Sequence, residues 1–375
     1  MKRLSNKTII FTYEFGLSSD GYGGGQTILL SLIREYLKKH FTVYLITPKT
    51  SNVIEEFKNL KCFIIYSKKY DSQIYTSLSL AKSFFNLINK FPHLDHSNFK
   101  VLSFTSEAFL CLIICKIKNI KFYTYLAAPK IPELSYFINL YNIKKNVLLI
   151  LFLLGAKFSR KCFCISNFIL NELKKKYNFK NLANVNCGIH NKFLSFKYKN
   201  PEQNNKINLL YVGRLALKQK PIHLIIESLK NINSLGKFYV AGSGPDKNIL
   251  LEMVRLKKLE RKVIFLGNLN ENSIIKYSKK CQIAILVSNY ESFMITAYEM
   301  AALVRKLVLS DVAGLKKRFS KFKGIAFIKN SKKDIIKTVN SLQKIKISNY
   351  DLGIRKNFLN KKFTWAKVYD EIEKY

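Results

Sequence analysis

The chain of 375 residues carries 64 Lys and Arg against 24 Asp and Glu, a formal net charge of +40. Its length predicts two domains, and its hydrophobic content of 48% excludes a disordered chain. A charge of this size points to a nucleic acid, an anionic membrane surface or an anionic small substrate as a partner, with AT-rich codon bias as a further source. Residues 1–195 hold 28 basic and 10 acidic side chains, and residues 196–375 hold 36 and 14. The basic residues are therefore spread over both halves and do not form a basic tail. The sequence also has no zinc-finger spacing and no RNA-recognition signature, which disfavours a nucleic-acid-binding protein.

Seven cysteines are spread along the chain without a C-x-x-C pair, which is typical of reduced thiols in a cytosolic protein. The N-terminus is basic and then apolar, but Tyr13 and Glu14 interrupt a short apolar stretch. It therefore predicts a β-strand and not a signal peptide. The longest apolar run, residues 147–156, is well short of the roughly 18 residues of a spanning helix. It predicts a buried core helix, or a segment that dips into a membrane interface.

The first half of the chain alternates predicted strands and helices. A Gly-rich loop at residues 21–25 follows the first strand, and apolar residues at helical spacing then predict a helix over residues 26–39. The strands of this half are expected at residues 8–13, 42–47, 62–66, 101–104, 121–126 and 162–165. The alternation predicts a parallel sheet covered by helices on both faces.

A polar, Pro-containing stretch at residues 200–206 predicts a linker, after which the pattern restarts. Helices are expected at residues 221–231 and from the loop at residues 242–245 to residue 258. The strands of this half are expected at residues 208–212, 237–241, 263–266, 283–286 and 307–309. The sequence thus predicts two doubly wound α/β domains in series. Ligands of such sheets bind at the carboxyl ends of the strands, and a cleft between two domains is the expected site.

Two loops of the second half have the residues of a phosphate site. Arg214 directly follows a predicted strand, with Lys218 and Lys220 close behind, so this loop can aim cations at a diphosphate. Gly242 and Gly244 lie between a strand and a helix, where a bare backbone permits close approach. They do not form the G-x-G-x-x-G pattern of a dinucleotide site.

Two carboxylates stand eight positions apart in the segment ESFMITAYEMA. Glu291 ends a short polar loop, and Glu299 lies inside an apolar helix. The plain alternative is a helix N-terminal acid followed by a surface glutamate. The apolar neighbours of Glu299 argue against it, since a buried carboxylate needs hydroxyls or cations around it. The free N–H groups where this helix begins suit a phosphate. The segment SDVAGL at residues 310–315 adds another strand end with a Gly-bearing loop.

The segments VGRL, AGSGP, VIFLG, ESFMITAYEMA and SDVAGL, in this order, resemble the donor-binding half of glycosyltransferase family 4. The resemblance covers nearly all of residues 207–315. It extends more weakly to the Gly-rich loop, to residues 39–43, 164–166 and 185–190, and to the segment FTW at residues 363–365.

This resemblance implies the α/β GT-B fold, in which two Rossmann-like doubly wound parallel-sheet domains flank an interdomain cleft. It implies an acceptor-binding domain over residues 1–199, a donor-binding domain over residues 207–350, and a C-terminal helix in residues 351–375 that crosses back to the first domain. The implied function is a retaining transferase that moves a sugar from a nucleotide-diphosphate sugar, UDP-sugars foremost, to a glycan or lipid-linked glycan. Lipopolysaccharide or capsule synthesis on the cytosolic face of the inner membrane would be its setting.

The resemblance also implies roles for individual residues. Arg214 and Lys220, with Lys218 as the alternative, would hold the diphosphate, while Glu291 would contact the transferred sugar and Glu299 the ribose. The other implied donor-binding residues are Gly23, Gly24, Gly25, Gly213, Gly242, Gly244, Leu266, Gly267, Phe293, Met294, Ile295 and Thr296.

Negative charge that builds on a leaving phosphate can be stabilised by cations and helix-terminal amides, so the implied reaction needs no metal or cofactor. No D-x-D triplet is present.

The sequence departs from the family pattern at Met294, Val304 and Lys306, and at Ala127, where many members have a His. Because of these departures, the second alternative is a catalytically degenerate protein that binds a nucleotide sugar without transferring the sugar. A nucleic-acid binder, suggested by charge alone, is a third alternative. Membrane contact is expected at the basic residues around the apolar run, namely Lys144, Lys145, Lys157, Arg160 and Lys161.

Overall fold

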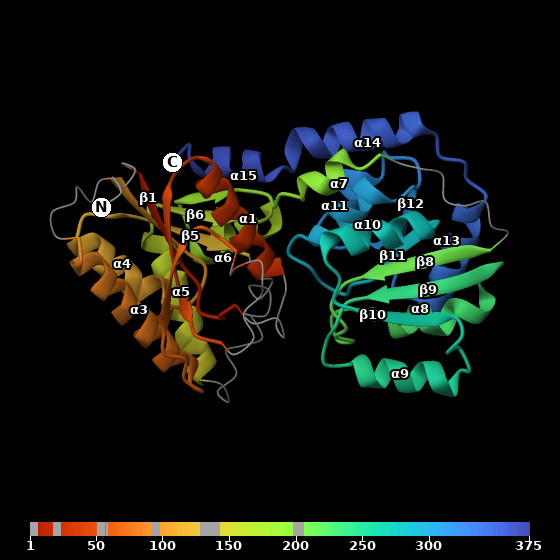
Figure 1. Ribbon diagram of the computed structural model, residues 1–375, viewed down its shortest axis with the longest axis horizontal. Coiled ribbons are helices and arrows are strands. Elements are labelled where there is room, and N and C mark those ends of the chain that lie inside the picture. Colours follow the sequence, from red (N-terminus) through yellow and green to blue (C-terminus); the bar gives the residue numbers. More distant parts are fainter. Residues whose placement is uncertain are drawn as a thin grey trace. The chain divides into compact units, whose positions relative to one another are not determined.

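The computed structural model describes residues 7–17, 24–50, 57, 59–91, 98–127, 143–197 and 206–375. Contacts divide the chain into two units, one of Met1–Cys187 with Trp365–Tyr375 and the other of Gly188–Thr364 (Figure 1). The sequence placed residues 188–199 in the first domain and residues 351–364 in the returning segment. The described part of the first segment, residues 188–197, and the whole of the second pack instead in the second unit. Helix α7 (Asn191–Ser195) contacts α10, α11 and α14, and α14 (Asn349–Lys362) contacts α11.

The first unit is built on a seven-stranded parallel sheet in the order β3-β2-β1-β4-β5-β6-β7. All six strands predicted here are present, and the three-residue strand β7 is additional. The strands are β1 (Thr8–Thr12), β2 (Thr42–Pro48), β3 (Phe63–Ser67), β4 (Phe99–Ser103), β5 (Lys121–Leu126), β6 (Lys161–Cys164) and β7 (Leu182–Asn184). The described helices of this unit are α1 (Gly24–Lys38), α3 (Gln73–Asn89), α4 (Ala108–Ile117), α5 (Ile143–Phe158), α6 (Asn167–Tyr177) and α15 (Trp365–Ile372). The apolar run at residues 147–156 lies within α5, and no helix in the described ranges is long and apolar enough to cross a membrane.

The last helix, α15, packs on α1 of the first unit, which confirms the predicted return of the C-terminus. Glu373 accepts a hydrogen bond of 2.8 Å from the Tyr36 hydroxyl and forms an ion pair of 2.8 Å with Lys100. The Tyr123 hydroxyl donates to the main-chain oxygen of Tyr375 at 2.8 Å. These contacts join the C-terminal residues to α1, β4 and β5.

A buried pair of glutamates lies beyond the carboxyl ends of the adjacent strands β1 and β4, where the sequence predicted no polar cluster. Glu107 accepts hydrogen bonds from Thr12 at 2.8 Å and from Ser103 at 2.9 Å, and a third from Thr105. Burial, and next the negative charge of Glu14, raise the pKa of Glu107 to about 7. The carboxylate of Glu14 in turn accepts hydrogen bonds from three side chains, Gln73, Ser77 and Ser106.

The second unit is built on a six-stranded parallel sheet in the order β10-β9-β8-β11-β12-β13. Its strands are β8 (Ile207–Val212), β9 (Leu235–Ala241), β10 (Val263–Gly267), β11 (Ile283–Leu286), β12 (Lys306–Ser310) and β13 (Ile325–Ile328). Besides α7 and α14, its described helices are α8 (His223–Ser228), α9 (Lys247–Leu256), α10 (Glu271–Lys280), α11 (Ile295–Leu303), α12 (Leu315–Phe319) and α13 (Lys332–Gln343). Strand β13 was not predicted, and the helix predicted at residues 221–231 is α8 followed by a 3-10 turn at Leu229–Asn231. Because all strands are parallel, the loops after β8, β9, β11, β12 and β13 emerge at one edge.

Candidate functional site

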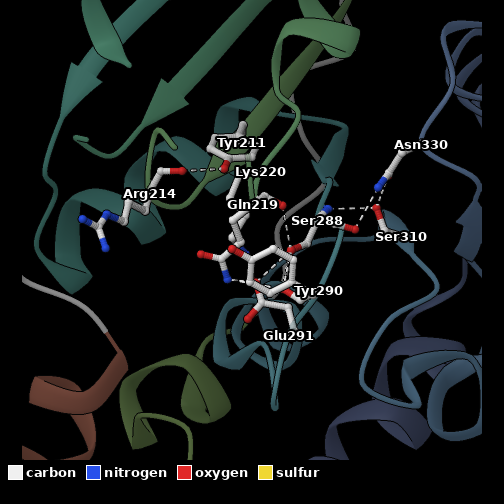
Figure 2. Close-up of polar contacts among 9 residues, drawn as sticks. All are labelled: Tyr211, Arg214, Gln219, Lys220, Ser288, Tyr290, Glu291, Ser310 and Asn330. Carbon is white, nitrogen blue, oxygen red and sulfur yellow. Dashed lines mark hydrogen bonds and ion pairs between the residues drawn. The ribbon is translucent and has the colours of Figure 1, made fainter. Parts of the chain in front are cut away.

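An ion pair between Lys220 and Glu291 lies at the carboxyl edge of the second unit's sheet (Figure 2). Lys220 comes from the loop after β8, and Glu291 from the loop between β11 and α11. Their side chains are only 11% and 12% exposed. Partial burial strengthens such a pair, and it makes an unpaired charge at either position costly.

The hydrogen bonds that described residues make to the Glu291 carboxylate all go to one oxygen, Oε1. Besides Lys220, the donors are the Ser288 hydroxyl at 3.0 Å and the Gln219 side-chain amide at 3.4 Å. The other oxygen, Oε2, has no hydrogen bond from any residue that the structure describes. The carboxylate is thus fixed through one oxygen, and the second remains available to a ligand.

The other predicted cations of this loop lie differently. Arg214 and Lys218 are both exposed, and in Figure 2 the Arg214 guanidinium points away from the ion pair. The main-chain oxygen of Arg214 accepts a hydrogen bond of 3.1 Å from the buried hydroxyl of Tyr211. Desolvation, and next the negative charge of Glu291, raise the pKa of that hydroxyl. Of the two lysines that the sequence left open, Lys220 is the one beside Glu291.

The predicted glycine loops pack on the loop after β8. A side-chain Cβ at Gly242 would lie 1.9 Å from the Gly213 oxygen, and one at Gly244 would lie 2.2 Å from the Leu215 oxygen. Gly242 N–H donates to the Gly267 oxygen at 2.7 Å, which brings the end of β10, with Leu266, to the same place. Glycine at 242 and 244 is therefore required for the close packing of these loops, whatever ligand they contact.

Helix α11 begins directly after the residue Met294, which has left-handed backbone angles (φ 57°, ψ 65°) and a buried side chain. A non-glycine residue is strained there, which gives a physical reason for the small residue of the family pattern. Phe293 is buried and stacks on Tyr298 with ring centroids 4.4 Å apart. Ile295 and Thr296 form the first turn of the helix and are partly exposed.

The second predicted acid, Glu299, lies within α11, and its side chain has no hydrogen bond or ion pair to the residues that the structure describes. Desolvation, and next the negative charge of Glu271, raise the pKa of Glu299 to about 7. Glu271 itself is paired with His190 at 2.8 Å and Lys192 at 3.6 Å. A carboxyl group in this setting gains from hydroxyl partners, as a ribose would supply.

The Gly-rich loop of the first unit is described only in part. Gly24 and Gly25 are the first two residues of α1, and Gly23 lies outside the described residues. Among the described residues, no group of three His, Cys, Asp or Glu side chains could hold a metal ion. That the reaction needs no metal stays a prediction.

Sequence reasoning missed three residues of the site, Gln219, Ser288 and Asn330. Gln219 lies between the two lysines already singled out, and the other two follow β11 and β13. Asking which polar residues follow adjacent parallel strands could have found Ser288. Asn330 could not be found in this way, because β13 itself was not predicted.

Comparison with known proteins agrees with this geometry. Residues 193–357 match the family model "Glycosyl transferases group 1". An uncharacterized glycosyltransferase of Methanocaldococcus jannaschii is 32% identical over 124 residues, which are 32% of this chain and 32% of that protein. A Campylobacter jejuni enzyme, N-acetylgalactosamine-N,N'-diacetylbacillosaminyl-diphospho-undecaprenol 4-alpha-N-acetylgalactosaminyltransferase, is 30% identical over 169 residues, 44% of this chain and 43% of that protein. The chain thus matches less than half the length of each relative.

The whole chain is also similar to solved structures. The structure of HepE from Anabaena in complex with UDP superposes with a TM-score of 0.75 at 12% identity, over 98% of both chains. At this identity the likeness concerns the fold, and it confirms the expected pair of parallel-sheet α/β domains of the GT-B type. The stretch that matches the family model "Glycosyl transferases group 1" thus falls within the second unit, which also holds the paired Lys220 and Glu291.

Proposed function

We propose that the protein is a retaining glycosyltransferase of family 4. It transfers a sugar from a nucleotide-diphosphate sugar, UDP-sugars foremost, to a glycan or lipid-linked glycan. The observation that supports the proposal is the buried Lys220–Glu291 pair at the carboxyl edge of the sheet in the unit that matches the family model "Glycosyl transferases group 1". The second unit would bind the donor, and the first unit the acceptor.

The pair suits the two charges of glycosyl transfer. As the bond between the anomeric carbon and the diphosphate oxygen breaks, negative charge builds on the phosphate, where Lys220, Arg214 and the amides at the start of α11 can stabilise it. The free Oε2 of Glu291 accepts hydrogen bonds from sugar hydroxyls. The acceptor oxygen forms the new bond on the same face of the sugar, and its proton passes to the leaving phosphate. No metal or cofactor is required in this scheme.

Glu299 is assigned to the ribose of the donor. Glu299→Gln is expected to weaken binding of the free nucleotide about tenfold, since a hydrogen bond to a charged group contributes about 1.5–3 kcal/mol. Preference among sugars should change little, because the ribose is the same in all UDP-sugars. Isothermal titration with UDP, and with Glu260→Gln on the exposed surface as control, measures the effect. Unchanged affinity for UDP would show that the ribose assignment is wrong.

The acceptor is proposed to be lipid-linked, as in lipopolysaccharide or capsule synthesis on the cytosolic membrane face. Two observations support this setting. The name of the Campylobacter jejuni relative includes a diphospho-undecaprenol acceptor. Helices α4 and α5 of the first unit, which pack against each other, also leave large apolar side chains exposed. These side chains are Ile113, Ile117, Val147, Ile150 and Phe158.

Basic side chains accompany these exposed apolar residues. The ammonium group of Lys116 lies 5.6 Å from the Phe158 ring centroid, and Lys157 is exposed next in sequence. Of the other predicted membrane-contact residues, Arg160 is exposed and Lys161 lies over the Tyr375 ring. The side chains of Lys144 and Lys145 lie outside the described residues. Apolar groups beside cations are typical of surfaces that bind anionic lipid.

The double substitution Ile117→Asp and Phe158→Asp is expected to reduce binding to vesicles of phosphatidylcholine and phosphatidylglycerol by tenfold or more, because it puts charge where apolar groups would enter the interface. Cosedimentation measures the binding. Leu256→Asp is the control, since Leu256 is an equally exposed apolar residue on α9 of the second unit. Equal binding of all three proteins would contradict the proposed surface.

Nucleotide release from a panel of UDP-, GDP- and ADP-sugars tests the enzyme proposal against its alternatives. A degenerate nucleotide-sugar-binding protein would bind a donor without releasing nucleotide. A nucleic-acid binder would bind DNA or RNA tightly, with a steep dependence on salt.

A further inference from the structure

Three neighbouring strands of the second unit, β11, β12 and β13, lead to polar side chains that meet at the carboxyl edge. Ser288 follows β11, Ser310 ends β12 and Asn330 follows β13 (Figure 2). Ser288 and Ser310 are almost completely buried, at 0% and 2% exposure. Buried hydroxyls need hydrogen-bond partners, and here each finds its partners in the neighbouring strand ends.

The three residues form a closed hydrogen-bonded ring around the main chain of Ser288. The Ser288 N–H donates to the Ser310 hydroxyl at 2.9 Å, and that hydroxyl donates to Asn330 Oδ1 at 2.5 Å. Asn330 Nδ2 donates to the Ser288 carbonyl oxygen at 2.8 Å. Both main-chain polar groups of Ser288 are therefore bound by the side chains of Ser310 and Asn330, and we name these two residues the strand-end clasp.

Hydrogen bonds connect the clasp both to the loop that carries Lys220 and to the Glu291 carboxylate. Asn330 Nδ2 also donates to Asn289 Oδ1 at 2.8 Å. Asn289 N–H donates to the Gln219 oxygen at 2.8 Å, and its side-chain amide donates to the Lys218 oxygen at 3.0 Å. The loop that carries Lys220 is thereby tied to the same strand ends as Glu291.

The Ser288 hydroxyl links the clasp to the carboxylate. It has oxygen atoms of Gln219 at 3.2 Å, Tyr290 at 3.1 Å and Glu291 at 3.0 Å within reach, but only one proton to donate. The charged carboxylate is the strongest acceptor of the three. Because the main chain of Ser288 is held at both polar groups, its hydroxyl is directed toward Oε1, and Oε2 is left for a ligand.

We propose that Ser310 and Asn330 are positioning residues. The strand-end clasp holds Ser288 so that Glu291 is fixed through Oε1 beside Lys220, with Oε2 turned toward the transferred sugar. The inference rests on the proposed glycosyltransferase function. It assigns Ser310 and Asn330 a role that acts on Glu291 through Ser288.

A double-mutant cycle with Glu291 tests the clasp. Asn330→Ala is expected to lower kcat roughly 10- to 100-fold with KM for the donor changed less than about threefold, because misplacement of a reacting group by about 1 Å costs up to about 100-fold. In a Glu291→Ala background the same substitution should lower kcat no further. Ser310→Ala, a smaller change at the other clasp residue, should behave alike. Asn340→Ala is the matched control, because Asn340 also bonds main-chain groups of this unit but not those of Ser288. Full kcat in both clasp variants, or an equal loss with and without Glu291, would overturn the inference.

A second measurement needs no activity. Competitive acetylation of the Lys220 amine, followed by mass spectrometry, should proceed at least threefold faster in Asn330→Ala than in the wild type or in Asn340→Ala. The rate should rise because a Glu291 carboxylate that is no longer held in place leaves the Lys220 amine more exposed to the reagent. An unchanged rate in both clasp variants would overturn the inference. A wild-type protein that binds no donor would contradict the proposed function, while acetylation would still decide for or against the clasp.

Discussion

Lys220→Met is expected to lower kcat/KM for the donor by about 10²–10³, the usual loss when one preorganised group that stabilises developing negative charge is removed. Lys218→Met, two residues away, should leave kcat/KM within about threefold, since the Lys218 side chain is exposed and Lys220 is buried beside Glu291. Steady-state nucleotide release with a saturating acceptor measures both. The comparison separates a specific cation from the general charge of the chain.

Loss of stability must be separated from loss of catalysis, because Lys220→Met leaves Glu291 partly buried without its cation. The double variant Lys220→Met with Glu291→Gln removes both charges. The midpoint temperature of its thermal unfolding should return toward the wild-type value, while its kcat/KM stays low. A Lys218→Met variant as impaired as Lys220→Met would contradict the assignment, and so would recovery of activity in the double variant.

Among the carboxylates of the first unit that the structure describes, replacement of Glu107 by Gln is expected to change the pH dependence of stability most. Burial and the neighbouring Glu14 raise the pKa of Glu107 to about 7, above the value of about 4.3 for an unperturbed glutamate. The folded protein therefore holds this proton more tightly than the unfolded chain. The contribution of Glu107 to the free energy of unfolding is therefore largest below about pH 4.3, falls as the pH rises toward about 7, and changes no further above that.

Urea unfolding of both proteins between pH 5 and pH 8 measures this contribution. The free energy of unfolding of the wild type should fall by an amount on the order of 1–3 kcal/mol relative to Glu107→Gln over this range. The glutamine keeps the shape of the side chain without the charge. Glu252→Gln, at an exposed position on α9, is the control and should follow the wild type. Parallel curves for wild type and Glu107→Gln would show that Glu107 does not titrate in this range.

The fold was largely predictable because alternating apolar segments mark doubly wound domains. The predicted strands at residues 121–126 and 283–286 agree with β5 and β11 to the residue. The unpredicted strand β7 has only three residues, too few for a periodic pattern to stand out from loops. Strand β13 was also not predicted, although its four residues equal the length of β11. The predicted boundary between the units was wrong because it depends on where the short helix α7 packs. The sequence of α7 does not indicate which helices it contacts.

The site was predictable at the level of loops and less so at the level of contacts. The sequence identified Glu291 and favoured Lys220, with Lys218 as the alternative, since only the path of the loop decides which ammonium group meets the carboxylate. The Glu14–Glu107 cluster and the strand-end clasp contain hydrogen bonds between residues that are 20 to more than 90 positions apart. Such pairings depend on strand order, which the sequence does not state.

The departures from the family pattern have identifiable contacts. Lys306 begins β12 and donates to the Gln343 oxygen at 2.9 Å, and burial lowers the pKa of its amine. The Val304 oxygen accepts a hydrogen bond from the fully buried Arg355 of α14. Both residues thus join α11 and β12 to C-terminal helices of the same unit. Neither contacts Lys220 or Glu291 within the described part of the chain.

Nucleotide release is the most direct test of the central claim, which is that Lys220 and Glu291 form the donor site of a glycosyltransferase. Wild-type protein incubated with a lipid-linked glycan and each of a panel of UDP-, GDP- and ADP-sugars should release nucleotide from at least one donor, with a UDP-sugar giving the highest rate. Glu291→Ala should lower that release strongly without abolishing it, and Lys218→Met should retain it. No release from any donor by a folded wild-type protein, or full release by Glu291→Ala, would contradict the claim.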